Sequence, residues 1–337
     1  MPVSASIDGP SRRALALPDL TDPRAGPHAL QQLVTDAHAA LAQRWGCRRQ
    51  LQRGTIIVAA SDSASIERQL TPELALRPRM RSLLPELLST QALDLPEDQL
   101  LVCPGMVYRH SPISPLHSSE PHQLDLWRLR RGRLGTIELA EMLRTVLGTL
   151  LPGHHYRLLP AARPHLSHSM RIDLHTSHGW LAIGRAGLLA PPLLAAAGLD
   201  PAELSAIGIT LGLDRVLMQR KGIHHIQLLR SRLPAIAAQM LDLEPFQLPV
   251  DAPVQIRDIA LPPATRSSAE QLADHIRTLL PEQLDMIEAV ELPAGNRLRL
   301  SLRHPCRQLS ERDADAIAAT VADLLAQPAA ERRAAYA

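Results

Sequence analysis

The residues between Val107 and Asp125 have the types and spacing most suited to chemistry. The segment reads VYRHSPISPLHSSEPHQLD, so that an arginine on an expected strand, Arg109, is followed by a polar loop and then by a strand with a His-Gln pair. A guanidinium stays charged and can hold two oxygens of one phosphate, whereas side-chain oxygens accept hydrogen bonds from an amine. Taken singly, the histidines here are more simply surface residues of a polar hairpin.

A second candidate anion site is the segment ITLGLDR, which ends at Arg215. The pattern of residues 208–213 predicts a strand that leads into a helix beginning near Asp214. This arrangement places Arg215 in the first helical turn, where backbone amides and the guanidinium together favour an anion. Alone, such an acid-base pair would often do no more than cap the helix.

Together the two segments resemble the second and third motifs of class II aminoacyl-tRNA synthetases of the phenylalanine type. In that family's second motif, VYR is followed eight residues later by His and thirteen residues later by His-Gln, and Arg109, His117, His122 and Gln123 have this spacing. The third motif is a glycine-rich strand that runs into a helix with an acid-arginine pair. Four matching residue types at fixed separations favour this family over an ordinary polar hairpin, although an inactive relative could keep them.

The resemblance implies activation of an amino acid with ATP and Mg²⁺, in which a carboxylate attacks the α-phosphate. That step depends on positioning and on neutralising charge at the phosphate oxygens. The implied catalytic residues are Arg109, at the α-phosphate, and Arg215, at the γ-phosphate. The implied ATP-binding set adds His117, Asp214 in the usual place of Glu, and Pro121 in place of the Phe expected to stack on adenine.

The resemblance also implies an amino-acid site, in which Gln123 and Asp125 receive the substrate ammonium. Its expected residues are His122, Gln123, Asp125, Arg77 and Gly187. Family carboxylates are replaced near Ser167, Arg171 and Ala182, which weakens the expected Mg²⁺ site, and no protein metal site is predicted. The chain holds only seven aromatic residues, counted as one Phe, three Trp and three Tyr, so phenylalanine is not assured as the substrate.

The length of 337 residues and a hydrophobic content of 45% predict a globular protein of more than one domain. The expected fold is α+β: a class II synthetase antiparallel sheet flanked by helices, followed by a small ferredoxin-like α/β sandwich. The first helix is expected at residues 29–45, before Gly46. The expected divisions are an N-terminal extension (1–28), a catalytic domain (29–242), a linker (243–252) and an anticodon-binding-type domain (253–330).

No segment of the sequence suggests a membrane span or a targeting signal, and we expect a cytoplasmic protein. The longest apolar runs are broken by proline or glycine. Three widely separated cysteines indicate neither a disulfide framework nor a thiolate metal site. The family's first motif is matched poorly, without its strand proline, so a monomer and a homodimer both stay open.

The C-terminal region, 253–313, resembles the ferredoxin-like anticodon-binding domain of single-chain mitochondrial-type phenylalanyl-tRNA synthetases. Independently, leucines alternate with arginines and a serine on a strand over residues 297–303, so that Leu298, Leu300 and Leu302 would face the core. The opposite face would suit RNA phosphates, or would only be a solvated strand face. The expected RNA-binding residues are Arg297, Arg299, Arg303 and Arg307.

Three functions are compatible with the sequence. The first is adenylation of an amino acid followed by its transfer to tRNA. The second is a diverged synthetase paralogue that activates a different amino acid for a non-tRNA acceptor, and the third is a non-catalytic relative that binds RNA or a ligand.

Reversing the charges of Arg297, Arg299 and Arg303 tests the predicted RNA face. If this face binds phosphates, the triple variant should bind tRNA more weakly and with a smaller salt dependence, as measured by filter binding at several salt concentrations. Unchanged binding would favour the solvated strand face.

Overall fold

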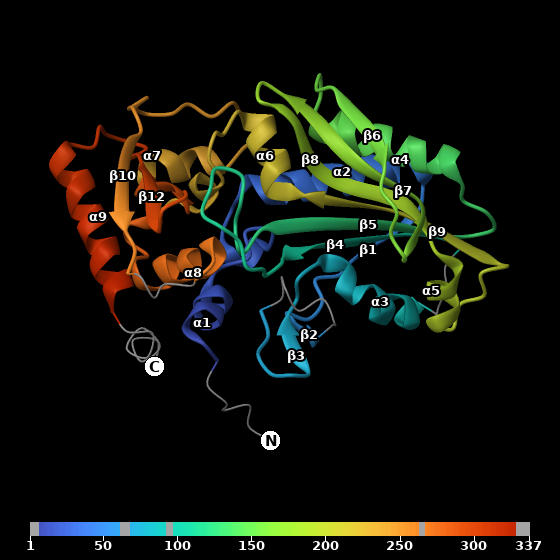
Figure 1. Ribbon diagram of the computed structural model, residues 1–337. Helices are drawn as coiled ribbons and strands as arrows, with labels where there is room; N and C mark the ends of the chain where they lie inside the picture. Colours follow the sequence, from blue (N-terminus) through green and yellow to red (C-terminus); the bar gives the residue numbers. More distant parts are fainter. Residues whose placement is uncertain (1–6, 61–67, 92–96, 263–266, 328–337) are drawn as a thin grey trace.

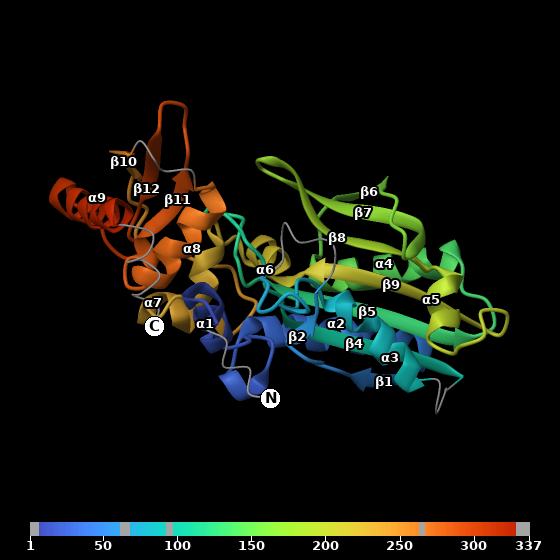
Figure 2. The same ribbon diagram turned by 60° about the horizontal axis from the view of Figure 1, so that its bottom comes forward.

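A computed structural model describes residues 7–60, 68–91, 97–262 and 267–327. Its centre is a seven-stranded sheet in the order β1-β4-β5-β9-β8-β7-β6, drawn in Figures 1 and 2. Neighbouring strands are antiparallel except for the parallel pair β1 and β4. The strands are β1 (Arg48–Leu51), β4 (Asp98–Met106), β5 (His122–Arg131), β6 (Tyr156–Pro160), β7 (Leu166–Thr176), β8 (Gly179–Leu189) and β9 (Leu204–Gly212).

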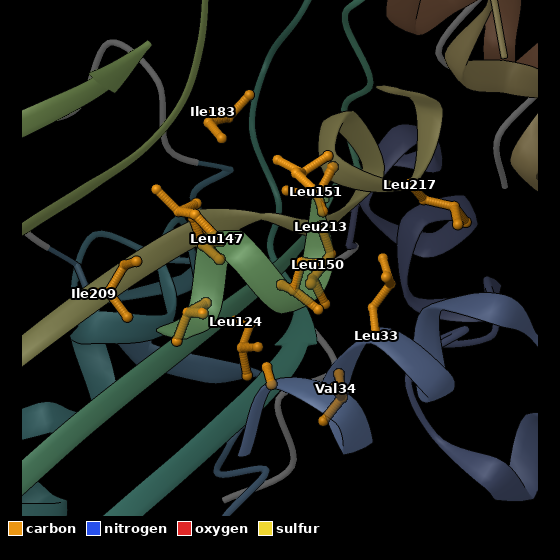
Figure 3. Close-up of a cluster of buried hydrophobic side chains, with 14 of the residues drawn as sticks. Leu33, Val34, Leu124, Leu147, Leu150, Leu151, Ile183, Ile209, Leu213 and Leu217 are labelled. Carbon is orange, nitrogen blue, oxygen red and sulfur yellow. The ribbon is translucent and has the colours of Figure 1, made fainter. Parts of the chain in front are cut away.

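Three helices cover one face of this sheet: α2 (Ala29–Trp45), α4 (Thr136–Leu150) and α6 (Leu213–Lys221). Helix α2 ends at Gly46, whose φ of 62° is the left-handed conformation that glycine adopts without strain. Leucines of α2 and α4 pack with Leu124 of β5 and Ile209 of β9, as Figure 3 shows. The large core therefore lies between the helices and this face, and the opposite face is left for other contacts.

The opposite face of the sheet carries α3 (Leu84–Gln91) and α5 (Pro191–Ala196), which pack on a smaller core around Trp127 and Leu129. A short antiparallel pair, β2 (Ile57–Ala59) and β3 (Leu74–Leu76), lies outside the large sheet. Helix α7 (Pro234–Ala237) follows η3 (Ile226–Arg230), and a further short 3-10 turn is η2 (Met80–Leu83). This architecture confirms the predicted α+β fold.

The C-terminal module follows the order β10 (Gln255–Ala260), α8 (Ala269–Leu279), β11 (Ile287–Glu291), β12 (Arg297–Leu302) and α9 (Glu311–Ala326). Its antiparallel sheet has the order β10-β12-β11. Leu298, Leu300 and Leu302 are fully buried, as their alternation predicts. The described part thus holds three strands and two helices in an order that a ferredoxin-like sandwich shares, and the ferredoxin-like assignment stays a prediction.

The first residues of the described chain pack on both parts of the protein. Helix α1 (Gly9–Ala16) lies against α8 of the C-terminal module. The carboxylate of Asp19 accepts a hydrogen bond from the backbone amide of Met106 at 3.2 Å, at the end of β4. The segment expected to be an extension is therefore part of the packed structure.

The loop between β4 and β5 reaches into the C-terminal module. Ile113 in this loop is fully buried in the module's core, and its carbonyl accepts a hydrogen bond from the amide of Val290. Arg277 of α8 donates to the carbonyls of Ser111 and Pro112 at 2.8 and 2.7 Å. Three of the loop's residues are thus held by the C-terminal module.

A buried ion-pair network fixes the same junction. Asp274 of α8 accepts from Arg68 at 2.7 Å, from His110 at 2.8 Å and from Arg277 at 3.3 Å. Burial alone would raise the pKa of Asp274, but the His110 hydrogen bond and the two arginines hold it below its usual value.

Among the described residues, none of the helices has the combination of length and hydropathy that a membrane crossing requires.

Replacing Asp274 with Ala tests this junction, because the change leaves two buried arginines without their carboxylate. We expect the free energy of unfolding to fall by about 3–5 kcal/mol, measured by urea denaturation. The matched control is Asp258→Ala, which breaks the more exposed pair of Asp258 with Arg299 and should lower the free energy of unfolding much less. Equal losses in the two variants would contradict a structural role for the buried network.

Candidate active site

A cavity of about 740 Å³ opens on the sheet face opposite α2 and α4. Its walls come from β5, β8, β9, the turn η2, the β4–β5 loop, the β6–β7 loop and the start of α6. The lining is strongly basic, and among the described residues it contains a single carboxylate, that of Asp214. Its seven arginines are Arg79, Arg81, Arg109, Arg163, Arg171, Arg185 and Arg215.

The side chains of β5 point alternately to the two faces of the sheet, and those on one face form part of this cavity wall. Leu124 and Leu126 point to the helix-covered core, so Gln123 and Trp127 line the cavity on the other side. The Trp127 ring lies directly against β9 at Gly208, where an added Cβ would come within 2.3 Å of the ring. Only glycine at this position lets the ring lie so close to the strand.

Arg109 brings an uncompensated positive charge to the cavity. Its backbone amide bonds the carbonyl of Ser119, but its Nε atom is buried and has no hydrogen-bond partner in the described structure. Burial lowers the pKa of Arg109, and the neighbouring charges of Arg79 and Arg215 lower it further. An anion bound here would satisfy both the buried donor and the repelled charge.

Arg215 lies in the first turn of α6, where the sequence predicts it. Its guanidinium donates to the carbonyl of Ala182 at 2.9 Å and to that of Leu116 at 3.1 and 3.3 Å. These bonds connect β8, α6 and the β4–β5 loop around the cavity. His117 of that loop also lines the cavity and contacts the Ser114 hydroxyl at 2.7 Å. The pKa of His117 is lowered by burial and then by Arg215 and Arg109, so the imidazole is held neutral.

His122 and Asp214 form a buried pair between the start of β5 and the start of α6. The carboxylate accepts from the backbone amide of His122 at 2.7 Å and from its Nδ1 at 2.6 Å. The other ring nitrogen, Nε2, accepts from the amide of Leu20 at 3.2 Å and lies 3.0 Å from the Arg230 guanidinium. These partners assign the proton to Nδ1 and occupy both ring nitrogens, so His122 positions the strand and the helix.

Gln123 and Asp125 follow on the cavity face of β5. The amide oxygen of Gln123 accepts from the backbone amide of Met80 at 3.2 Å. Asp125 lies beneath the wall rather than in the lining, almost fully buried, and neither carboxylate oxygen has a hydrogen-bond partner in the described structure. Burial raises the pKa of Asp125 to about 7, while the adjacent Thr210 and Trp127 and the positive charges of Arg81 and Arg77 oppose this shift.

Besides Asp125, two further predicted amino-acid-site residues lie outside the cavity lining, Arg77 and Gly187. The Arg77 guanidinium donates to the carbonyls of Arg53, Thr55 and Met106 at 2.8–2.9 Å, which is a role in holding backbone together. Gly187 lies in β8 against Leu166, where an added Cβ would approach the Leu166 side chain to 3.2 Å. By contrast, the cavity lining includes the other predicted site residues: Arg109, His117, Pro121, His122, Gln123, Asp214 and Arg215.

The predicted RNA-binding arginines are largely ion-paired. Arg299 binds the Asp258 carboxylate at 2.8 and 2.9 Å, Arg303 binds Glu288 at 3.0 Å, and Arg307 binds Asp313 at 2.8 Å. Arg297 is exposed on the same sheet. These carboxylates reduce the positive potential that the surface offers to phosphates.

The residues of the cavity do not fit a protein-held Mg²⁺ ion. Magnesium prefers oxygen ligands, carboxylates above all, and the lining contains only the Asp214 carboxylate, which His122 already occupies. Across the described residues, no three His, Cys, Asp or Glu side chains group as a metal site. Asp173 nearby is bound by Arg171 at 2.7 and 2.8 Å.

Sequence reasoning missed part of the cavity wall. Arg79, Arg81, Arg163, Arg185 and His165 line the cavity but come from three separate segments, none of which carries a recognisable motif. The only local signal was the density of arginines around residues 77–81.

Comparison with known proteins places this geometry in a family. Residues 53–239, more than half of the chain, match the family described as tRNA synthetases class II core domain (F). The chain belongs to this class II synthetase family. The matched range contains both predicted motifs and every residue that lines the cavity. The resemblance read from the sequence is thereby confirmed.

Individual relatives of this class II core are similar over a shorter range. The phenylalanine–tRNA ligase alpha subunit of Streptomyces avermitilis is 27% identical over 151 residues, covering 38% of this chain and 41% of the relative. The alpha subunit of Enterococcus faecalis is 30% identical over 146 residues, covering 38% and 40%. The chain thus spans about two fifths of the length of these relatives.

Asp125→Asn tests the unusual protonation of the buried carboxyl. Because its pKa in the folded state exceeds the ordinary value of 3.8, the native state holds the proton more tightly than the unfolded state. Its contribution to stability is therefore present at low pH and is lost as pH rises toward about 7. Between pH 5 and 7 the variant should gain unfolding free energy relative to the wild type by up to about 1.4 kcal/mol per pH unit. Parallel stability curves from urea denaturation would contradict this.

Proposed function

We propose that the protein activates an amino acid with ATP, forming an aminoacyl-adenylate and releasing pyrophosphate. The observation that carries the proposal is the half-buried Arg109 in the cavity of a class II synthetase core, whose buried Nε has no hydrogen-bond partner in the described structure. A fixed charge without an internal partner is suited to an anion that arrives with the substrate.

In the proposed reaction the carboxylate of the amino acid attacks the α-phosphorus of ATP, and the bond to the bridging oxygen of pyrophosphate breaks. Arg109 binds the α-phosphate and neutralises the charge that develops on its oxygens. Arg215, held by the carbonyls of Ala182 and Leu116, receives the terminal phosphate together with the first turn of α6. His117 donates to the phosphates, and Pro121 offers only an apolar surface to the adenine.

The substrate ammonium belongs near Gln123 and Asp125 in this proposal. An ammonium beside Asp125 would favour the ionised carboxylate and lower its raised pKa. Because the Gln123 oxygen is held by Met80, the carboxylate is the stronger candidate acceptor. His122 acts indirectly, by holding β5 against α6 through Asp214.

Magnesium enters this proposal only as the ion that accompanies ATP, bound through the phosphates. Arg79, Arg109 and Arg215 in the lining offer positive charge of their own to the nucleotide. No step is assigned to a protein-bound metal ion.

We propose tRNA as the acceptor of the activated amino acid, because the class II core and its relatives are those of tRNA ligases. These substrates would place the protein in the cytoplasm. A second candidate is a non-tRNA acceptor, and the pairing of Arg299, Arg303 and Arg307 with carboxylates favours it. Charging of total tRNA by the active enzyme decides between the two acceptors.

Amino-acid-dependent ATP–pyrophosphate exchange tests the activation step, with the wild type supplied with each natural amino acid and with acidic and phosphorylated ones. Arg109→Ala should lower exchange by at least about 100-fold, because it removes the charge that stabilises the transition state. The fold should survive, since the side chain has no internal bond to lose at Nε.

The matched control for this variant is Arg220→Ala, in the last turn of α6 and outside the cavity lining. It should leave exchange unchanged. Unaltered exchange in Arg109→Ala would remove the principal catalytic assignment, and no exchange with any of these acids would contradict activation itself.

A further inference from the structure

Three arginines in the cavity are not needed by the phosphate contacts assigned above. Arg81, Arg163 and Arg185, with His165 beside them, form what we call the arginine cluster. Within the described chain, none of these four side chains makes a hydrogen bond or ion pair to a protein group. Their charges therefore face the cavity without an ion-paired carboxylate, although Asp125 acts on Arg81 and Asp173 acts on Arg185 at longer range.

Two members of the arginine cluster lie on elements that adjoin the proposed ammonium site. Arg185 of β8 is the cross-strand partner of Thr210 on β9, and Thr210 is in turn the partner of Asp125 on β5. Side chains in register across adjacent strands share one face, so the three lie in one row. Arg81 belongs to the turn η2, whose first residue, Met80, binds Gln123.

Electrostatic effects separate this cluster from the phosphate arginines. Burial lowers the pKa of His165 to about 4, and Arg81, Arg163, Arg79 and Arg185 add to the shift. The pKa of Arg109 responds instead to Arg79 and Arg215, after burial. Arg79 alone acts on both groups, so it marks the boundary between the phosphate end and the amino-acid end.

The neighbour of Arg185 shows how the fold treats an arginine that it neutralises internally. Arg171 is the cross-strand partner of Arg185 on β7, and Asp173 binds it through two hydrogen bonds. The Asp173 carboxylate also accepts two hydrogen bonds from the guanidinium of Arg157. One row of the sheet thus holds Arg171, which Asp173 neutralises, and next to it Arg185, which lines the cavity without an ion pair in the described structure.

A neutral side chain would leave the arginine cluster unsatisfied. The reacting carboxylate of an amino acid brings one negative charge, which must meet the α-phosphate near Arg109, and its ammonium would be repelled by nearby guanidinium groups unless Asp125 received it. Positive groups gathered at a cavity wall repel one another, and an arriving anion relieves this repulsion, most strongly at the half-buried Arg81 and Arg185. The ligand must therefore carry further negative charge at this end.

We propose that the amino acid activated here bears a second anionic group, a carboxylate or a phosphate, on its side chain, and that Arg81, Arg163 and Arg185 bind it. This inference rests on the proposed adenylation. The planar fork of arginine suits both anions, and three forks from different directions suit a group with several equivalent oxygens. His165 contributes a neutral imidazole to the same wall.

ATP–pyrophosphate exchange with a substrate panel tests the inference. The panel contains neutral amino acids including phenylalanine, the dicarboxylic acids aspartate and glutamate, and the phosphorylated acids phosphoserine and phosphotyrosine. Wild-type enzyme should give its highest kcat/KM with an anionic member, and the two anionic arms show whether the group is a carboxylate or a phosphate.

Two variants identify the arginine cluster as the cause of this preference. Arg163→Gln and Arg185→Gln should each raise KM for the anionic amino acid about 10- to 100-fold, as the loss of a charge-assisted hydrogen bond predicts. The KM for ATP should stay within about twofold. The matched control is Arg144→Gln on α4, exposed on the helix-covered side of the sheet, which should leave every constant unchanged.

The outcomes separate this inference from the function beneath it. Exchange with an anionic amino acid that weakens in both variants supports the inference. Two results would overturn the proposed role of the arginine cluster and leave adenylation intact. One is exchange that prefers a neutral amino acid. The other is a preference for an anionic amino acid that survives in both variants while their thermal unfolding is unchanged. No exchange with any member of the panel overturns both.

Discussion

The carboxylate of Asp214 is the point on which the geometry of the site depends. It accepts two hydrogen bonds from His122, one from the backbone and one from the ring, and so holds the start of β5 against the start of α6. Arg215 follows Asp214 directly, and its guanidinium holds the carbonyl of Leu116 in the β4–β5 loop. Because both bonds involve buried groups at the junction, loss of the carboxylate would leave the backbone amide and the Nδ1–H of His122 without an acceptor and would weaken the link between the two motifs.

The same junction extends beyond the class II core. The Nε2 atom of His122 accepts from Leu20, in the segment before α2, and the β4–β5 loop is held on its far side by Arg277 and Asp274 of α8. The loop that carries the proposed ATP contacts is therefore supported by the N-terminal segment and by the C-terminal module. Such support from several elements limits the conformations of Arg109 and His117, which is what pre-organised phosphate binding requires.

Local features of the fold were predictable because they depend on short-range rules. Gly46 ends α2 in the left-handed conformation, Arg215 lies in the first turn of α6, and the three leucines of β12 face the core. The cavity residues of the two motifs were likewise found by spacing. The contacts of Arg77 and Gln123 could not be predicted, because their partners, backbone groups far along the chain, leave no trace in the local sequence.

The least predictable features are those that join distant segments through tertiary contacts. Burial of Ile113 in the core of the C-terminal module follows from packing between elements more than 140 residues apart in the sequence, as its bond from Val290 shows. The arginine cluster is assembled from η2, the β6–β7 loop and β8 only once strand register is known. Arginines scattered in a sequence normally indicate solvated surface, and only their unpaired state inside a cavity indicates a ligand.

The central claim, that this cavity forms an aminoacyl-adenylate, is tested most directly by isolating the product on the enzyme. Stoichiometric protein is incubated with ATP labelled at the α-phosphate, a mixture of neutral, acidic and phosphorylated amino acids, and inorganic pyrophosphatase, and is then separated by rapid gel filtration. We expect the label to co-elute with the protein only when amino acids are present. Label that never co-elutes, or that co-elutes equally without amino acids, would contradict it.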